Sequence, residues 1–400
     1  MINLCQNLSE SSSPQILESM NDVLKFVQSK FERLRSNFLQ IQFLTKKGLF
    51  IKPESKFIGQ TLKVKKRLNT MSRVPVNHTC VVIPLCKTLT LYLSQENVLS
   101  DLWKNVARNP DSITLPLLLF NDAFECGNPL GAHAGVNKIN GTYFSIPCIP
   151  PEKRGSLDTF FLAQLTKSSV IKRFGYKSTF KFLIDELNLL TERGLNVQSP
   201  SLQEVKVYFQ LGLLLGDNLG LNGIGGFIEN FSKSNYSCRI CLANKAQRDS
   251  MTVEDLSLLR TEANYKEGVR LKNPQATGIK EDSAFNKVTN FHVVSNAAVD
   301  IMHDLFEGLV KKVLVFLFQQ YISEARLFTL SQLNARLASF YYGCDTSNKP
   351  SLLSQNVLKS GNMNISSAEC ICLFNSIRGS SLGVVCVSPE NSRYFDEPSA

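Results

Sequence analysis

The sequence lacks the long apolar runs of membrane proteins. A transmembrane helix needs about 20 consecutive apolar residues, and the best candidate, residues 313–318, is far shorter and directly follows two lysines. The amino terminus, MINLCQNLSESSS, has neither the basic flank nor the apolar segment of a signal peptide. We therefore predict a soluble intracellular protein with no membrane partner.

Cysteine is too sparse for a disulfide scaffold, because 11 Cys are spread over 400 residues. This usage fits free thiols or a metal site in a reducing compartment. The sequence also has no Gly-x-x-x-x-Gly-Lys phosphate loop, no dinucleotide-binding glycine fingerprint and no Gly-x-Ser-x-Gly nucleophile elbow. We therefore expect no small-molecule substrate.

Apolar residues are nevertheless abundant enough for a sizeable core. Hydrophobic residues make up 43% of the chain and charged residues 20%, which excludes whole-chain disorder. A length of 400 residues suggests two or three domains. The expected order is a helical basic leader (1–75), the first part of the core (76–217), an insertion (218–295), a core helix (296–340) and a polar tail (341–400). We interpret the tail as truncated.

Positive charge is concentrated near the amino terminus. The formal net charge is +10, and residues 25–73 hold 13 Lys and Arg but only two acids, which leaves about −1 for the rest. A localised basic block suits a polyanion, because each neutralised phosphate releases counterions. Within it, Lys63, Lys65, Lys66 and Arg67 also resemble a short nuclear-import signal. These four residues are predicted to contact nucleic acid in the nucleus; a solvated helix face is the alternative.

Apolar residues in the leader recur at alternating steps of four and three from Met20 to Ile41. This spacing predicts a helix over residues 15–44, ended by Gly48 and Pro53. A 3.5-residue repeat permits a coiled-coil homodimer. The packing face of a globular leader is the alternative.

Two apolar strands that end in aspartates are the chemically informative feature. Residues 113–120 and 206–216 are near-continuous apolar runs, typical of strands buried on both faces. The first is followed by Asn121 and Asp122, and the second by Asp217. If the two strands are sheet neighbours, these carboxylates meet at the edge of the sheet. Residues 156–195 are predicted to be helical and residues 218–290 irregular.

A predicted helix over residues 300–322 supplies a third set of polar side chains. Asp300, His303, Asp304 and Glu307 are three and four residues apart, so an α-helix projects them from one face. Acids from two strands and one helix can bind two Mg²⁺ ions about 4 Å apart for phosphodiester chemistry. The alternative is that the strand-end aspartates only cap strands and that Glu307 is solvated.

A second constellation is the Cys-x-x-Cys pair of Cys238 and Cys241. Thiolates at this spacing commonly bind Zn²⁺, but a complete site needs two further ligands. His292 and His303 follow in the next segment, and a Cys-Cys-His-His site would pin the insertion to the late helix. Buried free thiols and a redox pair are the alternatives.

Several longer stretches resemble the transposase domain of CACTA-like (En/Spm-type) DNA transposons and their animal relatives. Together they cover roughly residues 113–325, and their order carries the resemblance. The stretches are FNDAFECGNPLGAHAG (120–135), YFSIPCIPPE (143–152), LIDELNLL (183–190), LLLGDNLGLNGIGGF (213–227), YSCRIC (236–241) and DIMHDLFEGLV (300–310).

The resemblance implies an α/β fold similar to ribonuclease H, with a mixed sheet, flanking helices and an interrupting insertion that contains the Cys-x-x-Cys pair. It implies DDE-type chemistry, in which three acids hold two Mg²⁺ or Mn²⁺ ions for DNA cleavage and transfer at transposon ends. Asp122, Asp217 and Glu307 match the first, second and third acids. Cys238, Cys241, His292 and His303 match a cysteine pair after the second acid and histidines before the third.

The sequence departs from the family pattern at two acids. An acid three residues before Asn-Pro falls on Glu125, which makes it the alternate first acid. The family glutamate usually lies two residues after the Met-His histidine, whereas Asp304 and Glu307 lie one and four residues after His303. Asp304 is therefore the alternate third acid. A catalytically inactive descendant that binds nucleic acid or protein is the alternative function.

Overall fold

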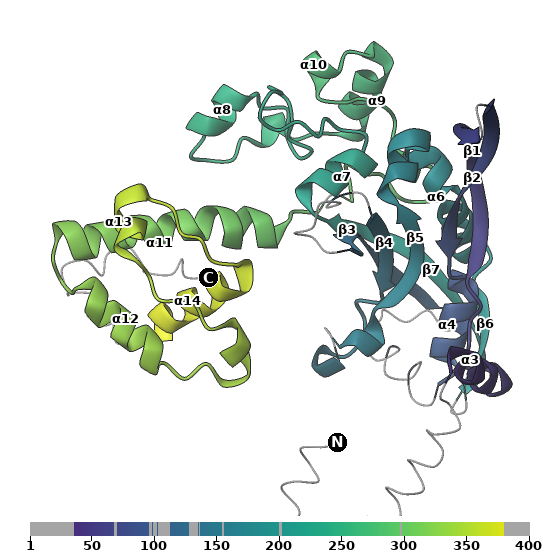
Figure 1. Cartoon of the computed structure of the whole chain (residues 1–400), viewed down its shortest axis with the longest axis horizontal. Helices are drawn as coiled ribbons and strands as arrows, with labels where there is room; N and C mark the ends of the chain where they lie inside the picture. Colours follow the sequence, from purple (N-terminus) through teal and green to yellow (C-terminus); the bar gives the residue numbers. More distant parts are fainter. Residues whose placement is uncertain are drawn as a thin grey trace, which may run out of the picture. The chain divides into compact units, whose positions relative to one another are not determined.

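The computed structural model describes residues 36–67, 70–95, 113–127, 137–153, 156–199, 202–296 and 298–379, together with the single positions Val98, Leu102 and Gly135. The protein is α/β, with a seven-stranded mixed sheet and flanking helices (Figure 1). Two compact units are distinguished, Met1–Pro116 with Tyr143–Gln210 and Leu117–Thr142 with Leu211–Ala400. No helix in the described ranges is long and apolar enough to cross a membrane.

The sheet has the strand order β1-β2-β5-β4-β3-β7-β6, which makes β3 and β7 neighbours. Both apolar strands predicted from the sequence are confirmed, and both are longer than predicted. The strands are β1 (Glu54–Arg67), β2 (Thr70–Val82), β3 (Ile113–Glu125), β4 (Lys138–Ser145), β5 (Phe161–Lys167), β6 (Leu195–Ser199) and β7 (Leu202–Gly216).

Strand β3 is buried on one face rather than on both. Leu115, Leu117 and Leu119 are almost completely buried, whereas the residues between them are partly or fully exposed and Phe120 is 39% exposed. The apolar run predicted a strand correctly. It did not predict how far each face would be covered, because that depends on the elements packed above and below the sheet.

One long helix packs against the first half of the sheet. α6 (Ser168–Glu192) contacts β1, β2 and β5, and α4 (Leu85–Leu93) packs against α6 and β6. Glu186 of α6 accepts a hydrogen bond from the backbone N–H of Leu85 at 2.9 Å, which satisfies a donor at the start of α4. The prediction of helix throughout 156–195 is wrong at its start, because β5 occupies 161–167 and pairs with β2.

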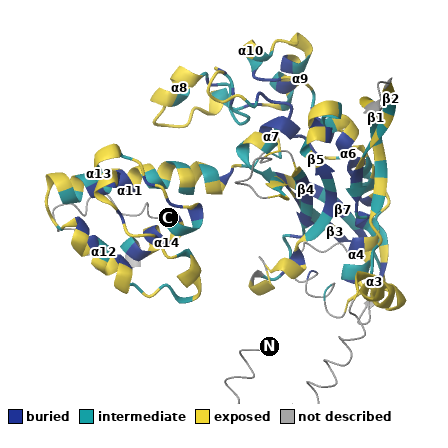
Figure 2. Ribbon diagram, in the orientation of Figure 1, coloured by how far each residue is buried: buried dark blue, intermediate teal, exposed yellow. Residues whose placement is uncertain are grey.

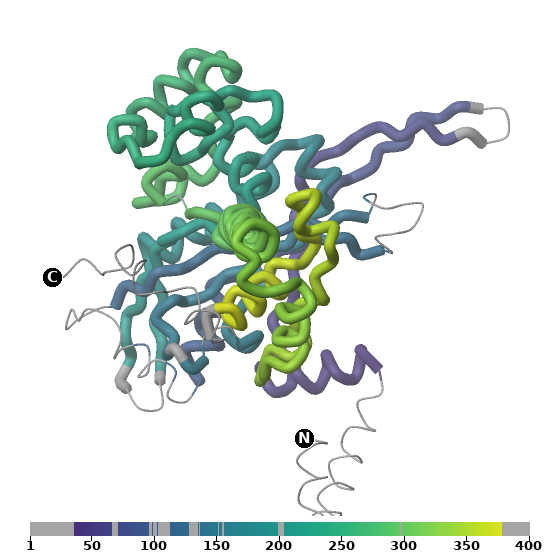
Figure 3. The backbone as a smooth tube through the Cα atoms, turned by 90° about the vertical axis from the view of Figure 1, so that its left-hand side faces the viewer, coloured from purple at the N-terminus to yellow at the C-terminus, as the bar shows by residue number. Residues whose placement is uncertain are grey.

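The leader is helical only in part. Residues 37–46 form α3 (Asn37–Lys46), capped by Ser36, and the rest of the predicted helix lies outside the described residues. The last part of the predicted leader belongs to a β-hairpin formed by β1 and β2. The reason is the period-two alternation of Leu62 and Val64 with Lys63 and Lys65, which suits a strand. Figure 2 shows α3 and much of this hairpin as exposed, and Figure 3 shows the hairpin as a purple arm.

The insertion is mainly irregular, as predicted. Its helices are short: α7 (Asn218–Ile224), α8 (Lys245–Ser250), α9 (Glu262–Leu271) and α10 (Pro274–Thr277). Isolated 3₁₀ turns occur both inside and outside the insertion. They lie at Pro151–Lys153, Leu157–Thr159, Leu256–Leu258, Ala284–Lys287 and Gly343–Asn348.

The helix predicted at 300–322 is present, but two of its segments have π-helical hydrogen bonding. It consists of η5 (Met302–Leu309, π), α11 (Val310–Phe318) and η6 (Gln319–Glu324, π). A π-helix bonds residue i to i+5 and so holds more residues per turn than an α-helix. Side chains three or four residues apart therefore do not line up as they would in an α-helix.

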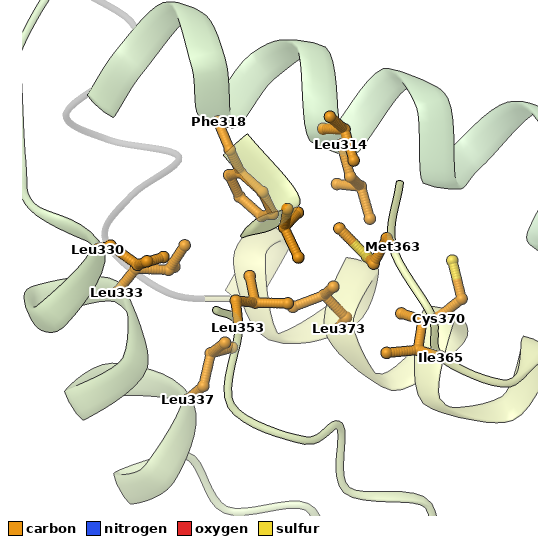
Figure 4. Close-up of a cluster of buried hydrophobic side chains, with 12 residues drawn as sticks. Leu314, Phe318, Leu330, Leu333, Leu337, Leu353, Met363, Ile365, Cys370 and Leu373 are labelled. Carbon is orange, nitrogen blue, oxygen red and sulfur yellow. The ribbon is translucent and has the colours of Figure 1, made fainter. Parts of the chain in front are cut away.

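Residues 341–379 do not behave as a polar tail. Together with α11 and α12 (Leu330–Ser339), the segment forms a second hydrophobic core (Figure 4) through α13 (Gln355–Ser360) and α14 (Ser367–Gly379). Apolar residues widely spaced in a polar sequence converge there. Its buried members are Leu314, Val315, Phe318, Leu330, Leu333, Leu337, Leu353, Val357, Met363, Ile365, Cys370 and Leu373.

Candidate active site

Asp122 and Asp217 follow directly on two residues that lie side by side in neighbouring strands. A Cβ atom added to Gly216 would lie 2.5 Å from the carbonyl oxygen of Asn121, so the backbones of β7 and β3 are in close contact there. Asp122 and Asp217 are the next residue in each chain segment. The structure thus places the predicted first and second acids each one residue beyond a backbone contact between neighbouring strands.

A buried amide pair fixes β3 immediately before Asp122. The Nδ2 atom of Asn121 donates to Oδ1 of Asn140 and to Oγ1 of Thr142, each at 2.8 Å, and Nδ2 of Asn140 donates back to Oδ1 of Asn121 at 2.9 Å. All three side chains are buried. Buried hydrogen-bonded amides hold one geometry, because breaking the pair leaves polar atoms unsatisfied. This network positions the backbone that carries Asp122.

The two candidates for the first acid differ in their contacts. Asp122 is exposed, and its Oδ1 accepts from the backbone N–H of Ala123 at 2.7 Å. Glu125 ends β3, and its Oε2 accepts from the backbone N–H of Gly135 at 2.6 Å. Glu125 therefore has a loop-closing contact, whereas the Asp122 carboxylate faces solvent. We expected the strand to end at Asp122, but it continues to Glu125.

Asp217 both ends the strand region and begins a helix. Its Oδ1 accepts from the backbone N–H of Gly220 at 2.5 Å, which makes Asp217 the N-cap of α7. An N-cap aspartate satisfies one of the unpaired donors of the first turn. Asp217 therefore follows the strand as predicted, and its structural role is to cap a helix rather than the strand.

Asn218 joins the strand end to the late helix. Its backbone N–H donates to Oδ2 of Asp300 at 3.1 Å, and its Nδ2 donates to Oδ1 of Asp304 at 2.7 Å. Its own Oδ1 accepts from Nη1 of Arg239 at 2.6 Å. Asp300 and Asp304 thus lie next to the residue that follows Asp217.

Arg239, the residue after the first cysteine of the pair, is the cation of this cluster. Its Nη2 and Nε donate to the carbonyl oxygen of Ala298 at 2.8 and 3.2 Å. Burial lowers the pKa of Arg239, while the negative charges of Asp304, Asp300 and Asp217 oppose that shift. The guanidinium remains charged, because the ordinary pKa of arginine is far above neutral. Neither Arg239 nor Asn218 was predicted from the sequence.

His303 is bound to Asp300 rather than to the cysteines. Its Nδ1 lies 2.6 Å from Oδ2 of Asp300, and its backbone N–H donates to Oδ1 of the same carboxylate at 3.1 Å. Asp300 is buried, whereas His303 is partly exposed. Both carboxylate oxygens of Asp300 are consequently engaged within the protein.

Glu307 points to a different partner from the other acids. Its Oε1 accepts from Oγ of Ser367 in α14 at 2.6 Å. The π-helical winding of η5 gives the physical reason, because Asp304 and Glu307 are about 60° apart in an α-helix but roughly 115° apart at about 4.4 residues per turn. Asp304, the alternate third acid, lies closer to Asp217 through Asn218.

Cys238 and Cys241 lie together, but the two histidines do not join them. The backbone N–H groups of Ile240 and Cys241 both point at Sγ of Cys238, each at 3.3 Å. Burial, together with the neighbouring Cys238, raises the pKa of Cys241. The Nδ1 atom of His292 accepts from the backbone N–H of Val294 at 3.2 Å, and burial lowers its pKa. Within the described ranges, no three His, Cys, Asp or Glu side chains are placed to hold one metal ion.

Direct hydrogen bonds from two buried side chains hold the insertion. Nε of Arg260 donates to the carbonyl oxygen of Cys238 at 2.9 Å, and Nη2 donates to that of Thr277 at 3.0 Å. The hydroxyl of Tyr265 donates to the carbonyl of Gly225 at 2.8 Å and accepts from the backbone N–H of Ser283 at 2.9 Å. Arg239 adds a direct contact from the Cys-x-x-Cys segment to the carbonyl oxygen of Ala298.

The predicted nucleic-acid contacts lie in the β1–β2 hairpin, and all four belong to β1. Lys63 and Lys65 are exposed; the side chains of Lys66 and Arg67 lie outside the described part. Compared with protein-family models and with curated protein sequences, the chain matches none.

Proposed function

We propose that the chain is a DDE-type transposase related to those of CACTA-like elements, that its core is ribonuclease-H-like, and that it cleaves and joins DNA strands in the nucleus. The observation that carries the proposal is the backbone contact between Asn121 and Gly216, the residues directly before Asp122 and Asp217, in neighbouring central strands. Carboxylates at adjacent strand positions repel each other, and they are favoured where a cation offsets their charge. An α/β sheet with flanking helices is compatible with that core.

The two strand acids fit a divalent metal, whereas the third does not. Asp122 is exposed and offers the hard oxygen ligands that Mg²⁺ or Mn²⁺ prefers, and Asp217 uses one oxygen for its cap. Glu307 is bound to Ser367, and Asp304 lies beside Asn218 and the Arg239 guanidinium. When bound, such ions would stabilise the attacking and leaving oxygens of a phosphodiester. Cys238 and Cys241 would supply two ligands to Zn²⁺.

Metal-dependent nicking of supercoiled plasmid tests the proposal. Purified protein is incubated with Mg²⁺ or Mn²⁺ beside Asp122→Asn and Asp217→Asn. Asparagine also serves as an N-cap, so Asp217→Asn removes the charge while keeping the first turn of α7. Asp249→Asn, an exposed acid of α8, is the matched control. We expect the two strand variants to lose nicking and the control to retain it; nicking that persists in both strand variants would contradict the assignment.

The third acid is decided by a second pair of variants. Asp304→Asn and Glu307→Gln each remove one carboxylate and leave a hydrogen-bonding amide. Loss of nicking in only one of them identifies the residue that completes the site. Loss in Asp304→Asn is the outcome that the contacts of Asn218 favour.

A catalytically inactive descendant that binds nucleic acid or protein is the second candidate function. The specific observation in its favour is the Arg239 guanidinium, which already offsets the charge of Asp217, Asp300 and Asp304. Absent nicking together with intact, salt-sensitive DNA binding would favour this candidate.

Self-association through the leader helix belongs to the same proposal. Helix α3 buries none of its residues, and Phe38 and Ile41, the last two positions of the predicted stripe, are 70% and 43% exposed. Sedimentation equilibrium of the full chain beside Phe38→Ser/Ile41→Ser tests this. A monomeric wild-type chain would exclude a dimer of this kind.

A further inference from the structure

The distal part of the β1–β2 hairpin, residues 60–67 and 70–77, is a two-stranded ribbon that we call the arm. The strands pair in continuous antiparallel register from Gln60↔Asn77 to Arg67↔Thr70. In the described part of the sheet, β2 pairs with β5 only at Val81 and Val82, beyond the arm. At about 3.4 Å per residue the arm is roughly 24 Å long. Figure 3 shows it extending away from the neighbouring helix and strands.

The base of the hairpin is anchored, so the arm has a fixed root. A Cβ atom at Gly59 would lie 2.3 Å from the Phe174 ring of α6, which shows how closely that ring packs on β1. The rings of His78 and Phe174 have centroids 5.3 Å apart, and the Lys56 ammonium lies 5.6 Å from the Phe182 centroid. An isolated hairpin is only marginally stable in water, and this packing supplies the missing support.

The charge of the hairpin is almost entirely positive. Residues 55–82 contain Lys56, Lys63, Lys65, Lys66, Arg67 and Arg73 and no acid. The acid Glu54 lies at the base and pairs with Lys56 at 2.7 Å. No carboxylate of its own strands therefore offsets the cations of the arm, and its field favours a polyanion.

The two faces of the arm carry different side chains. Directly paired residues share a face, which places Lys63 and Lys65 on one face with Val74 and Ser72. The other face carries the amides of Gln60 and Asn77 and the guanidinium of Arg73, and the register also assigns Lys66 and Pro75 to it. Three large apolar side chains on this face are strongly exposed. These are Leu62, Val64 and Met71, which are 62%, 53% and 77% exposed.

We propose that the arm enters the major groove of B-form duplex DNA, with the face of Gln60, Asn77 and Arg73 toward the base edges. The major groove is about 12 Å wide and admits a two-stranded ribbon. Amides pair with adenine, arginine pairs with guanine, and apolar side chains contact the thymine methyl group. Lys63 and Lys65, on the opposite face, reach the phosphates that wall the groove.

A-form duplex RNA is the discriminating competitor. Its major groove is deep and too narrow for a β-ribbon to reach the base edges. Its phosphates, however, carry the same negative charge as those of DNA. A purely electrostatic arm binds both duplexes, whereas an arm in the major groove prefers DNA. The inference rests on the proposed function only in taking DNA as the nucleic acid that the arm binds.

The test is fluorescence anisotropy of the full chain on a labelled DNA duplex, on duplex RNA of the same sequence and on single-stranded DNA, at several salt concentrations. Lys63→Gln/Lys65→Gln should make the slope of log affinity against log salt shallower by about 2, at roughly 0.9 per lost phosphate contact. Lys245→Gln/Lys359→Gln, two exposed lysines outside the arm, is the control with the same charge change. Its slope should equal that of the wild-type chain.

Arg73→Ala tests base contact. It should weaken duplex binding about tenfold or more and should abolish protection of a guanine N7 from dimethyl sulfate. Thermal unfolding of each variant verifies the fold. Equal affinity for duplex RNA, tighter binding to single strands, or an arm variant whose slope matches the control would overturn the inference.

The outcomes also separate the arm from the catalytic proposal. Nicking that depends on Asp217, combined with an unchanged slope in the arm variant, would reject the arm and leave the catalytic assignment standing. A shallower slope without any nicking would retain the arm and reject the activity.

Discussion

The central sheet and the insertion are held together by different interactions. In the sheet, apolar side chains such as Leu115, Leu119 and Phe209 are almost fully buried and supply the stability. In the insertion, Arg260 and Tyr265 each connect separate backbone segments through hydrogen bonds, with little regular structure around them. Both regions bury apolar side chains, including Phe227, Ile279 and Phe285 in the insertion. The difference is that the insertion also relies on two polar side chains to join its separate backbone segments.

Gly278→Ala is expected to have the largest effect. Gly278 has φ +76°, and an added Cβ would lie 1.9 Å from the carbonyl oxygen of Tyr236. Strain and the clash together should destabilise the insertion by about 4 kcal/mol. Gly361→Ala is the matched control, because Gly361 has φ +72° but nothing within 4 Å, and it should cost about 1 kcal/mol. Hydrogen exchange of the segments around each position, residues 226–283 for Gly278→Ala and residues 353–373 for Gly361→Ala, measures the difference, and equal effects would refute the clash.

Leu119→Ala should have the next largest effect, this time in the sheet. Leu119 is fully buried in β3, and removing its side chain leaves a cavity. The expected loss in unfolding free energy is about 3 kcal/mol. Leu213→Ala in β7, which is 36% exposed, should cost about 1 kcal/mol or less. Denaturant unfolding tests the pair, and similar costs would show that burial does not set stability there.

Tyr265→Phe removes one hydroxyl and tests the insertion without a cavity. The variant leaves the carbonyl of Gly225 and the N–H of Ser283 without their partner. Unsatisfied buried groups of this kind cost about 1 to 3 kcal/mol. The expected result is faster proteolysis of the insertion than in Tyr321→Phe, a substitution outside it. An unchanged proteolysis rate would mean that water replaces the hydroxyl.

Glu186→Gln should have the smallest effect, and that effect depends on pH. Burial raises the pKa of Glu186 above its ordinary value near 4.5. The folded state then binds the proton more tightly, so the stabilisation is complete below pH 4.5 and is lost as pH rises through the raised pKa. Glutamine cannot ionise, so the stability of the variant relative to wild type should increase with pH. A pH-independent difference would contradict this.

The sequence predicted the features that depend on local pattern. Apolar runs located β3 and β7, and these strands proved to be sheet neighbours that touch at Asn121 and Gly216, just before the two aspartates. The hairpin was missed because its alternation is carried by Lys63 and Lys65 in a block that we interpreted by charge alone. The strand β5 was missed because seven residues before a long helix give too short a signal.

The parts of the site that could not be predicted depend on contacts between distant residues. Asn218 meets Asp304, and Arg239 meets Ala298, only after the insertion has folded. No periodicity in the sequence encodes such pairs. The one available signal was an arginine inside a Cys-x-x-Cys pair, a position where a charged residue has to find a partner once it is buried.

The wide turn of η5 makes the direction of Glu307 a property of chain length. Deletion of one residue directly after Glu307, at Gly308 or Leu309, is the smallest change that would restore ordinary α-helical winding. Glu307 would then share a face with Asp300 and Asp304. A single-codon deletion could therefore turn Glu307 from Ser367 toward Asp300 and Asp304 while every acidic side chain is kept.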